Sequence, residues 1–181
     1  GIGPDNIDIV INELDALAHI DLKTKEIKAI GRTLNIVRIG TSGSVQADIP
    51  VDSFVISEKS IGCDGVLRFY ANNESVCDHP FEEAFIRHCR WTPSAARPYV
   101  VNADPGLVDR LYDEEHTIKG VTLTAVGFYG PQGRVLRLPL AMPGINDRIT
   151  AFRYEGYKVT NYEMESAAIT GLCNLLGHRA A

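Results

Sequence analysis

The strongest constraint on the fold is a strand-to-helix junction near the end of the chain. A segment of strand character, Tyr157 to Thr160, leads through Asn161-Tyr162-Glu163-Met164-Glu165-Ser166 into an apolar helical segment that stops before Gly177. In α/β proteins such junctions lie at the open end of a sheet, where ligands bind. The junction therefore predicts an α/β fold with two carboxylates, Glu163 and Glu165, at a ligand-binding edge.

The two carboxylates need polar partners. An ionised acid accepts hydrogen bonds and cannot donate them, so a pair of neighbouring hydroxyls, as on a ribose, is one suitable partner. The alternative is that Glu163 and Glu165 occupy the first turn of the helix, from about Glu163 to Leu176, where the helix dipole favours acids.

The rest of the chain alternates between strand and helix character, which indicates an α/β fold with a mixed or mainly parallel sheet. No repeat, low-complexity tract or linker divides residues 1–181, so we expect one domain. The expected strands are 35–39, 53–60, 120–127 and 157–160, with 66–70 as a further extended piece. The expected helices cover 7–17 after a cap at Asp5 or Asn6, 81–89, 105–115, 145–154 and the final segment.

The two ends of the chain carry their own expectation. The turn at Gly1-Ile2-Gly3 is of a kind that normally follows a strand, and another strand is expected after Gly177. We therefore expect a domain whose N-terminal and C-terminal portions lie outside this chain.

Composition excludes several classes of partner. With 45% hydrophobic and 23% charged residues among 181, the chain has an ordinary globular composition, and its net charge of −5 offers no general attraction to nucleic acids or anionic membranes. No segment resembles a membrane span or a secretory leader. The four cysteines show no CxxC spacing, which indicates reduced thiols and a cytoplasmic location.

A second candidate segment combines an arginine with a turn of small residues. Arg38 stands in an apolar run, two residues before Gly40-Thr41-Ser42-Gly43. A guanidinium fork with hydroxyl and backbone donors is suited to binding phosphate. The alternative is that Arg38 pairs with an internal acid for structural reasons.

The third candidate segment is Phe128-Tyr129-Gly130-Pro131-Gln132-Gly133-Arg134. The Gln132 amide matches a heterocycle edge with one acceptor beside one donor, as in uracil at O2 and N3-H, and the Arg134 guanidinium suits the carbonyl at O4. Purines present a different pattern. The alternatives are an exposed loop in which Gln132 and Arg134 are solvated, and a core position for Phe128.

The remaining motifs predict no other chemistry. No two histidines share one face at ligand spacing with a supporting acid, so we expect no zinc site: they are His19, His79, His88, His116 and His178. Gly1 to Gly3 lacks the full GxGxxG spacing, and no GxSxG elbow is present.

Together these segments resemble the uridine phosphorylase branch of the nucleoside phosphorylase family. The resemblance covers most of the chain through, in order, Gly1-Ile2-Gly3 with Asn6 and Glu13-Leu14, Val37 to Gly43, Asp64-Gly65, Phe128 to Arg134, and Asn161 to Ser166. The turn after Arg38 and the last motif, occurring together, are specific to the wider family, and the Phe-x-x-x-Gln-x-Arg pattern points to pyrimidines. Residues 81–115 match less clearly and stay unassigned.

The resemblance implies a single three-layer α/β/α domain with a mixed central sheet. It also implies reversible phosphorolysis, in which uridine and phosphate give uracil and ribose 1-phosphate. Arg38 and Thr41 would bind phosphate. Met164 would pack under the ribose, and Glu165 would accept hydrogen bonds from its hydroxyls, with Glu163 beside it.

The same resemblance implies which residues contact the base and which stabilise the negative charge on it as it departs. Gly43 would lie along the base, Phe128 would pack against base or sugar, and Gln132 with Arg134 would hold the uracil edge. As the glycosidic bond breaks, the sugar gains oxocarbenium character and the uracil gains negative charge. Gln132 and Arg134 would stabilise that charge while Arg38 orients the phosphate. The implied catalytic residues are Arg38, Arg134 and Glu165.

The implied assembly is a homodimer-based oligomer, commonly hexameric, in which a neighbouring subunit completes each site. No cofactor is implied beyond phosphate as co-substrate, with a monovalent cation between subunits left open. The chain has no recognisable counterpart of the family's N-terminal Gly-Asp-Pro segment or of the later strand and loop that close the base pocket. Alternative functions are a purine nucleoside phosphorylase, a nucleosidase that uses water, and a non-catalytic nucleoside-binding module; Arg38 argues for phosphate, and Gln132 with Arg134 for uracil.

Overall fold

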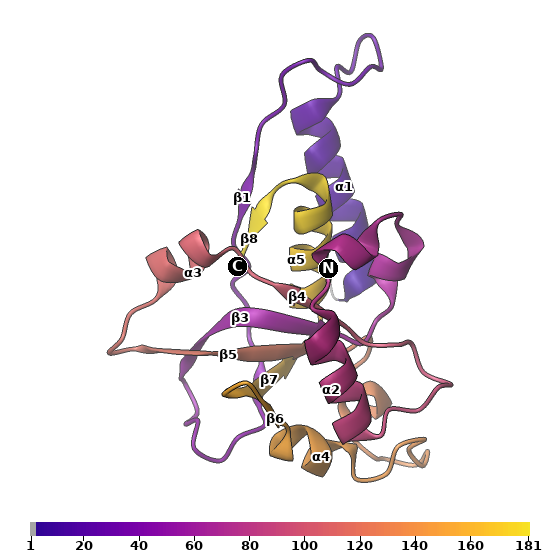
Figure 1. The fold of residues 1–181 in the computed structure, drawn as a ribbon, viewed down its shortest axis with the longest axis vertical. Helices are drawn as coiled ribbons and strands as arrows, with labels where there is room; N and C mark the ends of the chain where they lie inside the picture. Colours follow the sequence, from indigo (N-terminus) through magenta and orange to yellow (C-terminus); the bar gives the residue numbers. More distant parts are fainter. Residues whose placement is uncertain (1–2) are drawn as a thin grey trace.

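The centre of the molecule is a mixed sheet, seen here in a computed structural model that describes residues 3–181 (Figure 1). Its strands are β2 Gly43–Ser44, β3 Phe54–Gly62, β4 Tyr99–Asn102, β5 Thr117–Thr124, β6 Arg153–Tyr154 and β7 Tyr157–Glu163. The order is β2-β7-β5-β3-β4, and β6 also pairs with β7. Strands β3, β5 and β7 are parallel, whereas β2, β4 and β6 run antiparallel to their neighbours. The predicted mixed sheet is confirmed.

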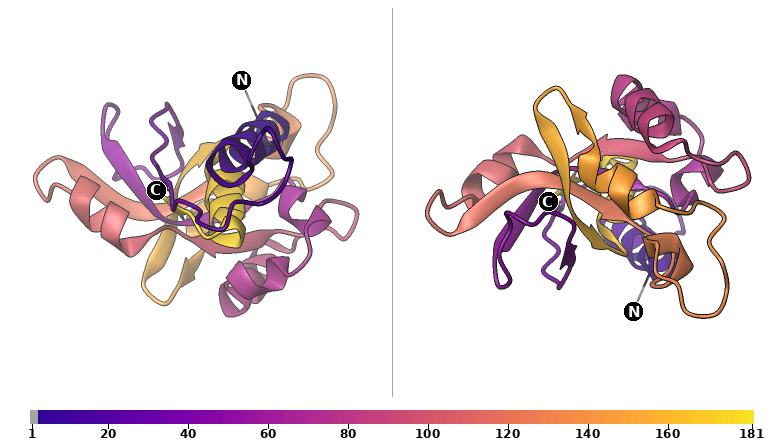
Figure 2. Two further views of the ribbon diagram at one scale, coloured as in Figure 1. Left: turned by 90° about the horizontal axis from the view of Figure 1, so that it is seen from above. Right: turned by 90° about the horizontal axis from the view of Figure 1, so that it is seen from below.

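Helices cover both faces of this sheet (Figures 1 and 2). They are α1 Pro4–His19, α2 His79–Cys89, α3 Pro105–Leu111, α4 Ile145–Ala151 and α5 Ser166–Leu176, with 3₁₀ turns η1 Val66–Phe69, η2 Asn73–Val76 and η3 Gly130–Gln132. One buried cluster joins α2 and α4 to the sheet through residues such as Phe81, Phe85 and Ile149. A second joins α1 and α5 through Ile11 and Leu172. Two cores separated by a sheet make three layers.

Local sequence explains where several helices begin and end. The Asp78 carboxylate accepts the N–H of Phe81 at 3.2 Å, and the Asp104 carboxylate accepts that of Leu107 at 2.9 Å, so both residues cap the helices that follow them. At the other end of α5, Gly177 adopts a left-handed conformation with φ 75° and terminates the helix.

Most expected elements are present, with shifted ends. The helices expected at 81–89, 105–115 and 145–154 are confirmed as α2, α3 and α4, and the strands expected at 53–60, 120–127 and 157–160 as β3, β5 and β7. The extended piece expected at 66–70 is wrong, because this segment forms η1. Its start is fixed by Gly65, at φ 78°, and by the Asp64 carboxylate, which accepts the N–H of Val66 at 2.8 Å.

The first helix differs from its prediction at the cap. Helix α1 begins at Pro4, its N-cap is Gly3, and neither Asp5 nor Asn6 serves as the cap. Its apolar residues at helical spacing are Ile7, Val10, Ile11, Leu14 and Leu17. Of these only Ile11 is fully buried, and Leu17 is largely exposed. Apart from Gly3, the expected turn at Gly1 to Gly3 lies outside the described residues.

The buried strand expected at 35–39 is also wrong. Only β1, Asn35–Ile36, is a strand, and it pairs in parallel with β8, Arg179–Ala180, away from the main sheet. Because the main sheet does not cover this run, its side chains reach solvent, and Ile39 is 94% exposed. Arg38 consequently lies in a loop, where its N–H donates to the carbonyl of Ala181 at 3.0 Å.

Two general features complete the fold. Within residues 3–181, no helix has the length and apolar character needed to cross a bilayer. All four cysteines are free thiols, and burial raises the pKa of Cys89 and of Cys173 to about 12.

Candidate active site

A cavity of about 700 Å³ opens where β7 ends and α5 begins. The three candidate segments, which are far apart in sequence, meet around it. Every residue assigned to the site from the sequence lines this cavity: Arg38, Thr41, Gly43, Phe128, Gln132, Arg134, Glu163, Met164 and Glu165. The structure adds Ile7, Ile39, Gly40, Ser42, Tyr162 and Ile169 to the lining.

Glu163 is engaged inside the protein. It is the last residue of β7 and is buried, and its Oε1 accepts a short hydrogen bond from the hydroxyl of Thr124. Its Oε2 accepts the backbone N–H groups of Glu165 at 2.7 Å and Ser166 at 2.8 Å. The carboxylate therefore satisfies the first donors of α5 from a strand position, and the alternative in which both acids lie in the first helical turn is wrong.

Arg38 bridges the two acids. Its Nη2 lies 2.6 Å from Oε2 of Glu165, and its Nε lies 3.4 Å from Oε2 of Glu163. The other oxygen of Glu165 accepts the N–H of Gly3, the N-cap of α1, at 2.8 Å. The side chain of Arg38 folds over Gly40, where a Cβ would come within 2.6 Å of the guanidinium, so a larger residue would displace the guanidinium from this position. The alternative in which Arg38 pairs with an internal acid is thus realised, within the cavity wall itself.

The small-residue turn is attached directly to the strand that carries the acids. Gly43 and Ser44 of β2 pair antiparallel with Tyr162 and Asn161 of β7. A Cβ placed on Gly43 would lie 3.9 Å from Nη2 of Arg134, so the turn also faces the third segment. The turn at residues 40–43 therefore contacts both the strand that carries the acids and the loop from Phe128 to Arg134.

The loop from Phe128 to Arg134 is ordered by contacts among its own side chains. The guanidinium of Arg134 stacks on the Phe128 ring at 4.1 Å from its centroid and donates to the Phe128 carbonyl at 2.6 Å. Arg134 also donates to Oε1 of Gln132. Gln132 is only 4% exposed, so the solvated-loop alternative is wrong for this residue, whereas Phe128, at 53%, is not a core residue.

Asn146 anchors this loop together with Tyr162, and the sequence predicted neither role. Asn146 donates to the carbonyl of Gln132 at 3.1 Å and accepts from the Tyr162 hydroxyl at 3.1 Å. Gly133, at φ 69°, lies so close to Asn146 that a Cβ would come within 2.6 Å of its amide. Asn146 comes from α4 and Tyr162 from β7, so the base-type loop is held by both a helix and the sheet. A single asparagine in a polar helix gave no signal of this role.

Asp64 of the Asp64-Gly65 motif does not line the cavity. Its carboxylate accepts the Tyr99 hydroxyl, with distances of 3.1 and 3.0 Å to its two oxygens, and the N–H of Val66. Burial raises the pKa of Asp64, and the nearby charge of Glu163 adds to the shift. The motif therefore holds the turn after β3.

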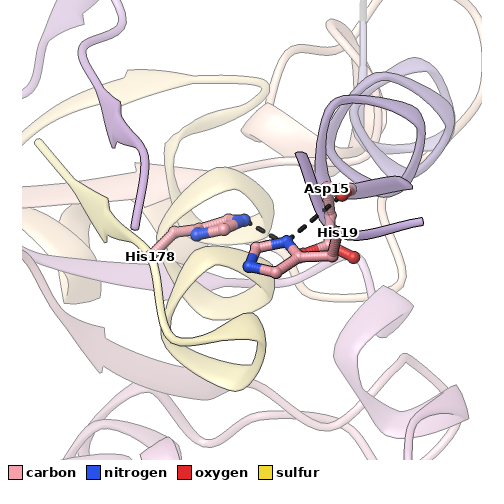
Figure 3. A group of neighbouring side chains, drawn as sticks. All are labelled: Asp15, His19 and His178. Atoms are coloured by element: carbon pink, nitrogen blue, oxygen red, sulfur yellow. Dashed lines mark hydrogen bonds and ion pairs between the residues drawn. The ribbon is translucent and has the colours of Figure 1, made fainter. Parts of the chain in front are cut away.

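Sequence spacing gave no pair of histidines with a supporting acid, but the fold brings two histidines and an acid together. Nδ1 of His19, Nε2 of His178 and a carboxylate oxygen of Asp15 all lie within 4.8 Å of one another (Figure 3). The spacing argument failed because His19 ends α1 whereas His178 follows α5, and the packing of the two helices brings them together. None of the three lines the cavity.

The sequence of this chain is similar to those of known nucleoside phosphorylases. A family model described as the phosphorylase superfamily matches residues 1–181. A uridine phosphorylase of Thermococcus kodakarensis is 26% identical over 162 residues, covering 86% of this chain and 48% of that protein. A DeoD-type purine nucleoside phosphorylase of Hahella chejuensis is 29% identical over 126 residues, covering 64% and 52%. The chain thus spans about half the length of the curated relatives it matches.

Solved structures share the fold. The crystal structure of a Trypanosoma brucei nucleoside phosphorylase, described as showing uridine phosphorylase activity, superposes with a TM-score of 0.81 at 26% identity, over 99% of this chain and 66% of that one. A Schistosoma mansoni uridine phosphorylase in complex with uracil gives a TM-score of 0.59 at 22% identity, over 99% and 55%. At that identity, the second likeness speaks for the fold alone.

Proposed function

The chain belongs to the phosphorylase superfamily, and on that premise we propose that its cavity serves the phosphorolysis of a nucleoside, with uridine as the substrate. The observation that carries this proposal is the convergence of three chemistries on one cavity. A guanidinium with a small-residue turn suits phosphate, a carboxylate suits ribose hydroxyls, and an amide with a second guanidinium suits uracil.

In this proposal phosphate attacks C1′ of the ribose as the bond from C1′ to N1 of uracil breaks. Arg38 holds the phosphate against the sugar carbon, which makes the attack effectively intramolecular. Glu165 accepts hydrogen bonds from the ribose hydroxyls and fixes the sugar. Arg134 faces the departing base and stabilises the negative charge that the bonding pair leaves on uracil.

Glu163 has a supporting role in this mechanism. Its oxygens already accept from Thr124, from two backbone amides and from Arg38, so it has little capacity left for a sugar hydroxyl. We assign it to positioning Arg38 and the start of α5, while Glu165 binds the ribose. The oligomeric assembly implied by the resemblance, with a neighbouring subunit beside the cavity, belongs to the same proposal.

Phosphorolysis of uridine by the full-length protein tests this function. Uracil release should require phosphate, and uridine should be preferred to inosine. Preference for inosine would favour the purine enzyme, a candidate supported by the Hahella chejuensis relative. Release of uracil without phosphate would indicate a nucleosidase, and saturable uridine binding without release would indicate a binding module; each of these outcomes contradicts the proposal.

Arg38→Ala tests the phosphate arm. Losing a charge-assisted hydrogen bond of about 1.5–3 kcal/mol should raise the KM for phosphate by roughly 10- to 150-fold. Arg32→Ala, which removes an exposed arginine upstream of the cavity, is the matched control and should leave the KM unchanged.

A further inference from the structure

The cluster of Asp15, His19 and His178 lies well away from the cavity. Ile7 lines the cavity and His19 ends the same helix, so at 1.5 Å per residue the two positions are about 18 Å apart along its axis. The cluster joins the last turn of α1 to the residue that follows the cap of α5 (Figure 3). A role here is separate from the proposed reaction.

Three potential ligand atoms converge in this cluster. Oδ1 of Asp15 lies 2.8 Å from Nδ1 of His19 and 3.1 Å from Nε2 of His178. The imidazole rings stack with centroids 5.3 Å apart and planes inclined by 27°, which directs both nitrogens toward the same carboxylate. Nδ1 of His19 also contacts the Asp15 carbonyl at 3.2 Å.

The position of His178 indicates a built site. Its side chain is 1% exposed, yet Nε2 has no hydrogen-bond partner among the described residues, despite its distance to Asp15. A buried nitrogen without a bond is costly, and a metal ion that takes the place of its proton removes the cost. Gly177 adopts a left-handed conformation and turns the chain. The backbone N–H of His178 then donates to the Cys173 carbonyl at 2.7 Å, and its side chain faces α1.

The surroundings favour a cation. Both α1 and α5 end at the cluster. Lys28 already donates to the carbonyls of Leu17 and Ala18 at the end of α1, at 3.0 and 3.1 Å, whereas the negative end of the α5 dipole is directed at the cluster. Asp15 adds a formal negative charge, and its side chain is 22% exposed, which leaves a path for solvent. Gly31 closes over His19, because a Cβ there would lie 2.1 Å from the ring.

We propose that Oδ1 of Asp15, Nδ1 of His19 and Nε2 of His178 bind a divalent metal ion, with Zn²⁺ as the best match. Two imidazoles and a carboxylate are zinc ligands, and three protein ligands leave a fourth position for water. Bound there, the ion cross-links α1 to the end of α5.

Metal binding at Nε2 requires a proton to move on His178. Its Nδ1 accepts the N–H of Leu34 at 3.3 Å, so without metal the neutral ring carries its proton on Nε2. Metal binding at Nε2 places the proton on Nδ1, where it opposes the Leu34 amide. Loading therefore breaks this long hydrogen bond and shifts the segment before β1, a cost that lowers the affinity.

Zinc titration of the chelator-treated, full-length protein, monitored by calorimetry, tests the site. We expect one Zn²⁺ per chain and, with Co²⁺ as a spectroscopic probe, visible absorption typical of nitrogen and oxygen ligands. His19→Ala and Asp15→Asn, both on the partly exposed helix, should weaken binding by more than the roughly 10- to 100-fold that loss of an outer-shell partner causes. His116→Ala removes an exposed histidine paired with one acid, Asp113, and should bind as the parent does.

Two readouts decide against the site. Equal zinc affinity in the parent, His19→Ala and Asp15→Asn proteins would overturn it, and loss of binding in His79→Ala instead would place the ion beside Glu74 and Glu82. Long-range ¹H–¹⁵N spectra should show His178 protonated on Nε2 without metal and on Nδ1 with zinc. Retention of the Nε2 proton in the zinc-loaded protein would also refute the proposal.

Discussion

Nη2 of Arg38 lies 2.6 Å from Oε2 of Glu165, so the groups proposed to hold phosphate and ribose bind each other directly. Each ligand must therefore replace an internal partner as it binds. Ribose hydroxyls that occupy Glu165 free a donor of Arg38, and phosphate that occupies Arg38 frees an acceptor of Glu165. The two ligands should consequently help each other to bind.

Glu165→Gln should move the two affinities in opposite directions. The neutral amide no longer pairs with Arg38, so phosphate alone should bind more tightly, whereas uridine should bind roughly 10- to 150-fold more weakly, the equivalent of about 1.5–3 kcal/mol. Calorimetry of each ligand measures both effects. Glu114→Gln, at an exposed position, is the control, and a parallel loss of both affinities would contradict the coupling.

Arg134→Ala should reduce the preference for uridine over inosine. Arg134 bonds to Gln132 and stacks on Phe128, so its loss also releases the amide that is proposed to read the base. The ratio of kcat/KM for the two nucleosides should fall by about 10- to 100-fold. Arg137→Ala removes an exposed arginine from the same loop, and an equal fall there would show that the effect is not specific.

Thr124→Val should destabilise the protein through Glu163. The buried hydroxyl donates to Glu163 and accepts the N–H of Ala167 at 2.9 Å, so its loss leaves two buried polar groups without that partner. We expect the free energy of unfolding to fall by about 1–3 kcal/mol, measured by urea denaturation. Thr33→Val, at an exposed position, should change it little. An unchanged stability would mean that the Thr124 hydroxyl contributes nothing net to capping α5.

Asp64→Asn should change how stability depends on pH. Burial raises the pKa of Asp64 above its ordinary value of 3.8, so the folded state holds this proton more tightly than the unfolded state does. The resulting stability is complete below 3.8 and is lost as the pH rises through the folded pKa, because the unfolded state releases its proton first. The variant lacks this loss, so its free energy of unfolding should gain on the parent as the pH rises toward neutral.

Asp113 provides the contrast for that experiment. Its hydrogen bond to His116 lowers the pKa of Asp113, so the stability it contributes is present above its ordinary value and lost as the pH falls. Urea unfolding of Asp64→Asn and of Asp113→Asn at several pH values should show stability differences from the parent that change with pH in opposite directions. The same trend in both would contradict the assignment of the Asp64 shift to burial.

The sequence predicted the cavity because its chemistry is local. Arginine beside a glycine turn, an amide two residues before an arginine, and acids after a strand are each short motifs, and the ends of parallel strands meet at one edge. The segment from Tyr157 to Leu176 joins a short strand signal to an apolar helical run that stops before Gly177. Its strand and helix were therefore predicted, although their boundary moved from Glu163 to Ser166.

Features that depend on packing between distant elements were missed. Strand β4 has only four residues, too few for a periodic signal, although Tyr99 within it is fully buried against Gly62. The proximity of His19 and His178 could not be predicted from sequence spacing, because spacing rules apply within one helix or strand and these residues belong to different elements. The exposure of Ile39 likewise follows from where the main sheet ends, which the apolar run does not encode.

The contact between Gly3 and Glu165 has an electrostatic consequence for the pair of helices that it joins. It places the N-termini of α1 and α5 together, and the contact between Asp15 and His178 places their C-termini together, so the two helices run in the same direction. Dipoles aligned side by side repel, whereas antiparallel neighbours would attract. Glu163 and Glu165 offset this repulsion at the positive ends. At the negative end of α1, the ammonium of Lys28 does so by donating to the carbonyls of Leu17 and Ala18 at 3.0 and 3.1 Å. The pair therefore directs its positive ends to the cavity and its negative ends to the side of Asp15, His19 and His178.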